Sequence, residues 1–176
     1  TIVNPTSFAN SVWTDVSIKP HTDPAKNPAI YGDVYGGGEV GSVRQGTNVE
    51  LTGGTIHHDA YAGGKGTIGE HAVAANVGGD ATITLDGTKF IPAYDTNGIP
   101  TSGRIFGANN VNGTPKGHVK VHVLQTVDSE KDTEVALVNR TTYDVGAVYG
   151  GGNNADYKPT STTDYAEVII DGCNKT

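Results

Sequence analysis

The chain has 176 residues, with 12 basic and 19 acidic side chains and a formal net charge of −7. A chain of this sign lacks the basic surface that phosphate backbones require, so no nucleic acid is expected as a partner. No apolar run approaches the roughly 18 residues of a membrane span, so no membrane insertion within this chain is expected. Helical patterns are scarce while Thr, Val, Gly and Asn are plentiful, which favours an all-β fold.

The first 29 residues differ from the rest of the chain. Four prolines interrupt any regular element there, although Trp13, Val16 and Ile18 fit one strand. Repeat arrays need an atypical terminal unit that covers the open end of their core. We therefore expect residues 1–29 to be an N-terminal cap, with a Pro-rich linker as the alternative. Trp13 favours the cap, because a linker rarely carries a Trp with nothing to bury it.

From residue 30 the chain repeats one short phrase four times. An aliphatic or Ala residue is followed by an aromatic and a Gly-rich stretch, at Val34–Gly38, Ala60–Gly64, Ile105–Asn109 and Val148–Gly152. The four aromatic members are Tyr35, Tyr61, Phe106 and Tyr149. Self-similarity of this kind is typical of repeat architectures, in which each repeat is one supersecondary unit. Residues 30–176 are therefore predicted to form one repeat domain.

An alternating apolar run follows each copy of this phrase. The runs begin at Val49, Ile83, Val121 and Val168, and three of the four end at a Gly. Such alternation indicates a half-buried strand followed by a turn. When the runs are superposed, their first residues form one aliphatic column. A second aliphatic column contains Leu51, Leu85, Val123 and Ile170.

These columns predict how the repeats pack. No single repeat could bury its own apolar face, so the repeats must stack on one another. We predict an all-β, right-handed parallel β-helix, or β-solenoid, of about four irregular coils, with a β-sandwich as the alternative. The insertion Ile91–Gly103 is expected to form a loop with a tight turn, and the insertion Gln125–Asp144 is expected to contain one helical turn or a short hairpin. A further phrase should follow Asp171, so we expect the repeat domain to be truncated at its C-terminal end.

The phrases Val34–Gly38, Val49–Thr55 and Val148–Asn153 resemble the glycine-rich repeats of surface or secreted proteins of gut bacteria. In that family "vyGGGn" alternates with "v.i.GGt", and the resemblance covers about Tyr31 to Gly172. His58 replaces a Gly of the other rounds, and the third round reads IFGANN. The resemblance implies an extracellular or cell-surface, adhesin-like solenoid with no defined catalytic residues.

The aromatic column allows two placements. Each aromatic follows an aliphatic residue, and neighbours on a strand point to opposite faces, so only one of the two columns faces the core. The usual burial ranking favours aromatics inside, with the glycines after them making room. If the aromatics face outward instead, they form a flat ladder on which sugar rings could stack. Tyr35, Tyr61, Phe106 and Tyr149 are therefore the candidate ligand-binding residues.

Two histidine clusters carry metal-binding residue types. In His57-His58-Asp59, adjacent residues on a strand would face opposite ways, which favours a solvated turn over a metal site. His118 and His122 alternate with Lys120 on one strand face, which indicates a polar outer face. We expect neither a metal nor a cofactor.

A polysaccharide-cleaving β-helix would need carboxylates about 5–9.5 Å apart. Asp86 and Asp171 share a strand position, but two rungs would separate them by roughly 10 Å. We therefore expect no catalytic residues and a structural or adhesive extracellular module, whose partner is a glycan or a host or bacterial surface protein. A polysaccharide-acting β-helix enzyme, either a lyase or a glycoside hydrolase, is the alternative function.

Overall fold

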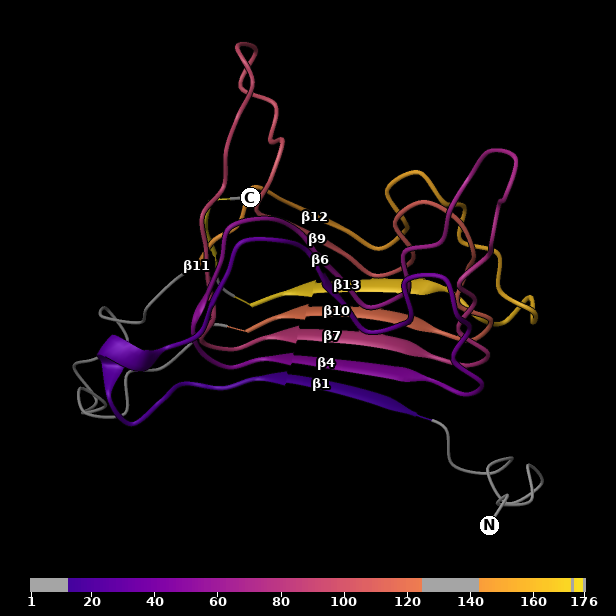
Figure 1. Ribbon diagram of the computed structural model, residues 1–176, viewed down its shortest axis with the longest axis horizontal. Coiled ribbons are helices and arrows are strands. Elements are labelled where there is room, and N and C mark those ends of the chain that lie inside the picture. Colours follow the sequence, from indigo (N-terminus) through magenta and orange to yellow (C-terminus); the bar gives the residue numbers. More distant parts are fainter. Residues whose placement is uncertain (1–12, 125–142, 172, 176) are drawn as a thin grey trace.

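The computed structural model describes residues 13–124, 143–171 and 173–175, and it shows a coiled chain of short parallel strands (Figure 1). The largest sheet has the strand order β1, β4, β7, β10, β13. Its strands are β1 (Thr14–Ile18), β4 (Thr47–Leu51), β7 (Ala81–Leu85), β10 (Val119–Val123) and β13 (Ala166–Ile170). Each coil contributes one five-residue strand, and successive strands stack without a register shift.

The remaining strands form smaller sheets on the other sides of the coil. One sheet has the order β12, β9, β6, β3, another the order β2, β5, β8, and β11 pairs with β14. Their bounds are β2 (Ala29–Ile30), β3 (Val34–Tyr35), β5 (Thr55–Ile56), β6 (Ala60–Tyr61), β8 (Lys89–Phe90), β9 (Arg104–Phe106), β11 (Tyr143–Asp144), β12 (Ala147–Tyr149) and β14 (Cys173–Lys175).

All pairings between these strands are parallel. The chain therefore folds as a parallel β-helix, and the alternative of a β-sandwich is wrong. The one helical element of the described residues is the 3₁₀ turn η2 (Pro24–Lys26), capped by the Asp23 side chain. Within the same residues, no helix has the length and apolar character to cross a membrane.

The two predicted aliphatic columns are confirmed in the five-stranded sheet. Val49 pairs with Ile83, Ile83 with Val121, and Val121 with Val168. The second column has the same register, and β1 adds Val16 and Ile18 to the two columns. Their central members belong to one buried hydrophobic core. Each such side chain contributes roughly 1.5–3 kcal/mol through its burial.

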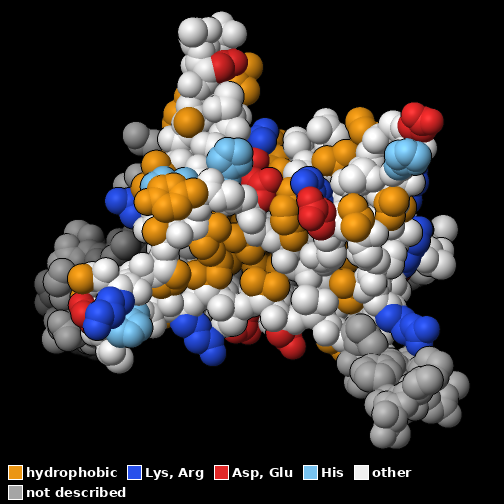
Figure 2. Space-filling view, in the orientation of Figure 1, with side chains coloured by type: hydrophobic (Ala, Val, Ile, Leu, Met, Phe, Trp, Pro, Cys, Tyr) orange, Lys and Arg blue, Asp and Glu red, His pale blue; other side chains and the backbone are white. Residues whose placement is uncertain are grey.

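The opposite wall of this core is the sheet that contains β3, β6, β9 and β12. Its inward residues Val34, Ala60 and Ile105 belong to the same core cluster, and Val148 packs against it. Hydrophobic side chains gather between the five-stranded sheet and the sheet that contains β3, β6, β9 and β12 (Figure 2). The residue that follows each aromatic also points inward, and it is always small: Gly36, Ala62, Gly107 or Gly150.

The small size of these residues lets the two walls approach each other. A Cβ on Gly107 would collide with the side chains of Val119 and Val121, and a Cβ on Gly36 would lie 2.9 Å from Val49 Cγ2. These glycines are thus required by close packing across the core, because neither has a positive φ angle.

The N-terminal segment joins the coil at β1. Thr14–Ile18 pair in parallel with β4, and the exposed Trp13 ring lies against Gly46, where a Cβ would collide with it. At the other end of the described sheet, Val168 and Ile170 are 40% and 45% exposed. The columns that are fully buried in the central coils are therefore open to solvent on β13.

Two insertions rise from the coil in Figure 1. Residues 91–103, predicted to be a loop, form a tall arm. The Tyr94–Pro100 bridge joins its two sides, and a turn at Asp95–Gly98 forms its tip. Gly103 ends this arm with φ +73°, a conformation that Gly adopts readily. A second protrusion, residues 65–74 between β6 and β7, did not stand out in the sequence. The predicted insertion 125–144 falls almost wholly outside the described residues.

Candidate functional site

The four aromatics of the repeat form one continuous stack. Ring centroids are 4.9 Å apart between Tyr35 and Tyr61, 4.8 Å between Tyr61 and Phe106, and 4.8 Å between Phe106 and Tyr149. The interplanar angles are 10°, 5° and 13°. The spacing equals the separation of neighbouring strands, so each ring lies directly on the ring of the next coil. We call these four residues the aromatic ladder.

The ladder lies on the outer face of its sheet, because the alternating aliphatic residues are the ones that enter the core. The favoured prediction placed the aromatics in the core, each ring stacked on the next. The rings do stack, and Tyr61 and Phe106 are buried, but the ladder lies on the face of its sheet opposite the aliphatic core. The residue after each aromatic explains why the aromatics face outward. Each small residue after an aromatic shares the aliphatic column's inward face, and only small residues fit where the two walls meet.

Outward orientation does not make the ladder a flat platform for sugars. Tyr61 is 1% exposed and Phe106 is 2% exposed, since each is covered on both faces by a neighbouring ring. Tyr149, at the end of the ladder, is 43% exposed. Stacking with a ligand ring is thus open only at the ends of the ladder, and its two central rings serve packing.

A buried ion pair borders the ladder. Asp59 Oδ2 accepts hydrogen bonds from Arg104 Nη2 at 2.6 Å and from Arg104 Nε at 3.1 Å, and Asp59 Oδ1 accepts one from the Arg104 backbone N at 2.9 Å. The hydrogen bonds to Asp59 raise the pKa of Arg104. The guanidinium also lies 5.2 Å from the centre of the Phe106 ring, within cation–π range. The pair therefore joins two coils beside the ladder.

A second polar group lies at the Tyr35 end. Asp33 Oδ2 accepts a hydrogen bond from the Tyr35 hydroxyl at 2.8 Å, and Asp33 Oδ1 lies 3.0 Å from His58 Nδ1. Asn110 Nδ2 donates to the Tyr35 hydroxyl oxygen at 2.6 Å. Burial, more than the Asp33 contact, raises the pKa of Tyr35. These side chains come from three coils and fix the outer edge of the first ring.

The cluster His57-His58-Asp59 is divided among three partners. His57 stacks on Tyr31 at 4.4 Å, His58 contacts Asp33, and Asp59 binds Arg104. These residues lie in the bend between β5 and β6, where neighbouring side chains point to different partners. Within the described ranges no group of three or more His, Cys, Asp or Glu side chains is arranged to hold a metal ion.

His118 and the polar residues of β10 pair with the coil that contains β13. His118 Nε2 lies 3.4 Å from Asp164, Lys120 Nζ lies 3.8 Å from Glu167, and His122 Nε2 lies 2.6 Å from Asp171. All are on the outer face of the five-stranded sheet or at its margin, at exposed or half-buried positions. Asp171, a member of the carboxylate pair considered above, is thus paired with a histidine.

Sequence reasoning did not find the Asp33–Asp59–Arg104 column. Each of these residues directly precedes an inward aliphatic residue, so the repeat alignment already places them at equivalent positions. In the structure each carboxylate accepts a hydrogen bond from the backbone N of the next member, at 3.2 Å for Asp59 N and 2.9 Å for Arg104 N. The signal was a column of charges that faces the same way as the aromatics.

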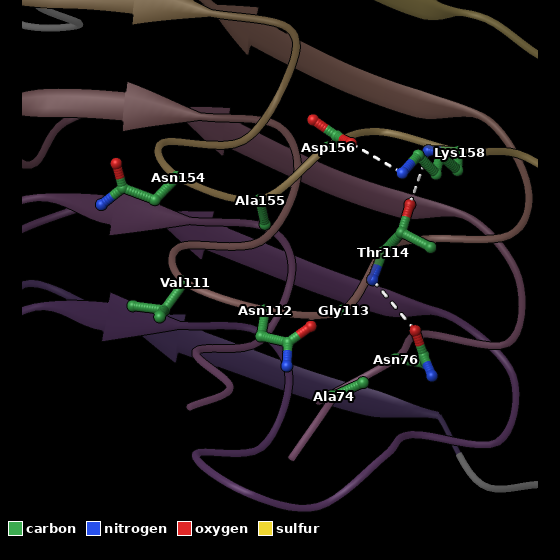
Figure 3. Close-up of a pocket in the computed structure, with 10 residues that line it drawn as sticks. All are labelled: Ala74, Asn76, Val111, Asn112, Gly113, Thr114, Asn154, Ala155, Asp156 and Lys158. Carbon is green, nitrogen blue, oxygen red and sulfur yellow. Dashed lines mark hydrogen bonds and ion pairs between the residues drawn. The ribbon is translucent and has the colours of Figure 1, made fainter. Parts of the chain in front are cut away.

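Sequence reasoning also missed a polar pocket at the turns that lead back to the five-stranded sheet (Figure 3). Its volume is about 340 Å³. Its walls come from the segments before β7, β10 and β13, which belong to three successive coils. They supply Ala74, Asn76, Val111, Asn112, Gly113, Thr114, Asn154, Ala155, Asp156 and Lys158.

The described residues form a parallel β-helix with a packed aromatic ladder, protruding insertions at 65–74 and 91–103, and a polar pocket between coils. No family model, curated protein or solved structure shows a significant match to the chain.

Proposed function

We propose that this chain is a non-catalytic extracellular or cell-surface repeat module with an adhesive role. In this proposal the β-helix is a stiff support, and the insertions 65–74 and 91–103 present the contact surface. The partner is a glycan or a surface protein of a host or bacterial cell. The resemblance of the VYGGG phrases to glycine-rich surface repeats agrees with this setting.

The observation that supports the proposal best is where exposed apolar side chains occur. In the insertion 65–74, Ile68 is 73% exposed and Val73 is also exposed. In the arm 91–103, Ile99 is 58% exposed. Tyr94, which forms the bridge with Pro100, is also exposed. Five of the twelve exposed large hydrophobic residues of the described chain lie on these two insertions. Exposed apolar surface on a protruding element is a candidate for contact with a partner.

The remainder of the coil supports a role in presentation. The ladder, the Asp59–Arg104 pair and the aliphatic columns each connect one coil to the next. Solenoids of this kind carry variable insertions as loops on one side while the stacked rungs remain regular. A loop held at both ends by such rungs can bind a partner with a smaller loss of conformational entropy.

The test is a binding measurement with the intact chain on immobilised mucin glycoprotein and on an array of surface glycans. We expect Tyr94→Ser combined with Ile99→Ser, or Ile68→Ser alone, to weaken binding about tenfold, because each removes apolar contact area. Val40→Ser is the matched control, since Val40 is exposed but lies outside both insertions.

Equal binding by the insertion variants and the control would refute the role of the insertions. A parallel screen for polysaccharide cleavage addresses the enzymatic alternative. Reproducible release of products from any polysaccharide would replace the adhesive proposal by that of a β-helix enzyme.

A further inference from the structure

The pocket of Figure 3 has the composition of a binding site for a neutral, hydroxyl-rich ligand. Its volume of about 340 Å³ lies at the lower end of the range for small-molecule pockets. Its three amide side chains, Asn76, Asn112 and Asn154, come from three coils. Segments distant in sequence therefore converge on one space.

The amides leave hydrogen-bonding groups free for a ligand. Asn76 Oδ1 accepts a hydrogen bond from Thr114 N at 3.1 Å, which leaves its Nδ2 group as a donor. Asn112 Nδ2 donates to Thr67 O at 2.8 Å, which leaves its Oδ1 as an acceptor. Asn154 is exposed, and its amide makes no interaction with the other lining residues drawn in Figure 3. The pocket thus offers donors and acceptors together.

This mixture of groups matches a sugar hydroxyl, which both donates and accepts. An amide can accept from one hydroxyl of a vicinal pair while it donates to the other. Ala74, Val111 and Ala155 add small aliphatic surface, against which the C–H groups of a sugar ring can pack.

The charges at the rim argue against an ionic ligand. The only charged side chains of the lining are Asp156 and Lys158, which pair with each other at 2.6 Å. The Lys158 ammonium, through this hydrogen bond, lowers the pKa of Asp156, and the pair adds no net charge. A phosphate or carboxylate ligand would have to compete with Asp156 for Lys158.

The pocket walls are fixed by the fold. Lys158 N donates to Thr114 Oγ1 at 2.8 Å, and Asn109 Nδ2 donates to Ala75 O at 2.7 Å and to Asn112 O at 3.2 Å. These bonds connect the three coils behind the pocket. The site is therefore preformed, which lowers the entropic cost of binding.

We propose that this pocket binds a neutral sugar residue, recognised by Asn76, Asn112 and Asn154. The inference rests on the proposed adhesive function, for which it supplies a ligand class and a second contact point. Ala74 ends the insertion 65–74 and lines the pocket, so a glycan held there would extend along that insertion.

The experiment uses the intact chain and a panel of neutral mono- and oligosaccharides built from glucose, galactose, mannose, fucose and N-acetylhexosamines. Binding is measured by ligand-observed NMR and then by calorimetry on the tightest sugar. We expect Asn154→Ala to weaken binding about tenfold and Ala155→Phe to abolish it by filling the pocket. Asn48→Ala is the control, since Asn48 lies in the five-stranded sheet, away from the pocket lining.

Asn154 is exposed and lies outside the strands, so the thermal unfolding of Asn154→Ala should match that of the parent. The test therefore stands even if Ala155→Phe folds poorly. The inference is overturned if no sugar of the panel binds at millimolar concentration, or if Asn154→Ala binds as tightly as Asn48→Ala. In either case, binding to mucin that is lost only in the insertion variants would leave the proposed adhesive function standing. If every variant still binds mucin while Asn154→Ala no longer binds the sugar, the proposed role of the insertions is overturned and the pocket is supported.

Discussion

At the scale of single residues, the glycines of the repeated phrase have separate tasks. Gly107 and Gly150 lie on the inner face and let the two walls of the core meet, whereas a Cβ at Gly151 would meet nothing within 4 Å. A phrase that reads as low-complexity sequence therefore contains positions with very different tolerance to substitution.

We predict that Gly107→Ala destabilises the protein by about 1–3 kcal/mol, because its added methyl group overpacks the core against Val119 and Val121. Gly41→Ala is the matched control, since nothing lies within 4 Å of a Cβ at that position. Urea unfolding followed by circular dichroism measures both. Equal midpoints for the two variants would show that the walls are not in close contact at Gly107.

The phenols of the ladder should limit stability at high pH. Burial is the main cause that raises the pKa of Tyr35 and of Tyr61 in the folded chain. In the unfolded chain these groups lose their protons near pH 10. Their contribution is fully present below that pH, and stability is lost as pH rises above it, because the unfolded state then binds fewer protons.

We expect unfolding to begin at a higher pH when Tyr35→Phe and Tyr61→Phe are combined. An alkaline titration followed by circular dichroism and tyrosinate absorbance measures the midpoint. The control pair is Tyr31→Phe with Tyr94→Phe, whose rings are exposed. A midpoint that moves equally in both double variants would argue against the role of the buried phenols.

At the scale of elements, the ladder shows how two-residue strands are held in place. β3 and β6 each contain only two residues, so few backbone hydrogen bonds support them. The stacked rings add contact along the whole column, and offset-stacked aromatic pairs contribute about 0.5–1.5 kcal/mol beyond their area. The ladder thus does for the short strands what β-branched columns do for the five-stranded sheet.

We predict that Tyr61→Leu costs about 2–3 kcal/mol, since it removes two ring contacts from a fully buried position. Tyr149→Leu should cost less than about 1 kcal/mol, because this ring has one ladder neighbour and is partly exposed. Chemical denaturation measures both values. A larger cost at Tyr149 than at Tyr61 would contradict the packing role of the central rings.

The sequence was sufficient to predict the stacked parallel strands and both aliphatic columns, because a two-residue period repeated in register has one economical packing. It did not decide which face the aromatics occupy. Alternation assigns neighbouring residues to opposite faces of a strand, but it does not show which face is buried in the core. The small residues Gly36, Ala62, Gly107 and Gly150 held that information, yet their meaning depends on how closely the opposite sheet approaches. The pocket was hidden for a similar reason: Asn76, Asn112 and Asn154 converge only once three coils stack.

At the scale of the whole molecule, stability is built coil by coil. In repeat proteins each unit contacts mainly its neighbours, so the free energy of opening depends on position along the stack. Strand β7 is paired on both sides, by β4 and β10. Within the described part of the chain β13 pairs with β10 alone, and its inward residues are partly exposed.

We therefore predict a gradient of hydrogen-exchange protection, with the amides of β7 and β10 slowest and those of β13 fastest. Local opening of β13 uncovers little buried apolar surface, whereas opening of β7 disrupts the pairings on both of its sides and approaches global unfolding. Exchange measured by mass spectrometry on peptides that cover Ala81–Leu85 and Ala166–Ile170 tests this. Ile83→Ala should speed exchange mainly in β7 and in the strands paired with it, β4 and β10, because it removes buried contacts there. Ile170→Ala should act mainly on β13. Equal protection of β7 and β13 in the parent would mean that the coils open together as one cooperative unit, and the nearest-neighbour description of this β-helix would be wrong.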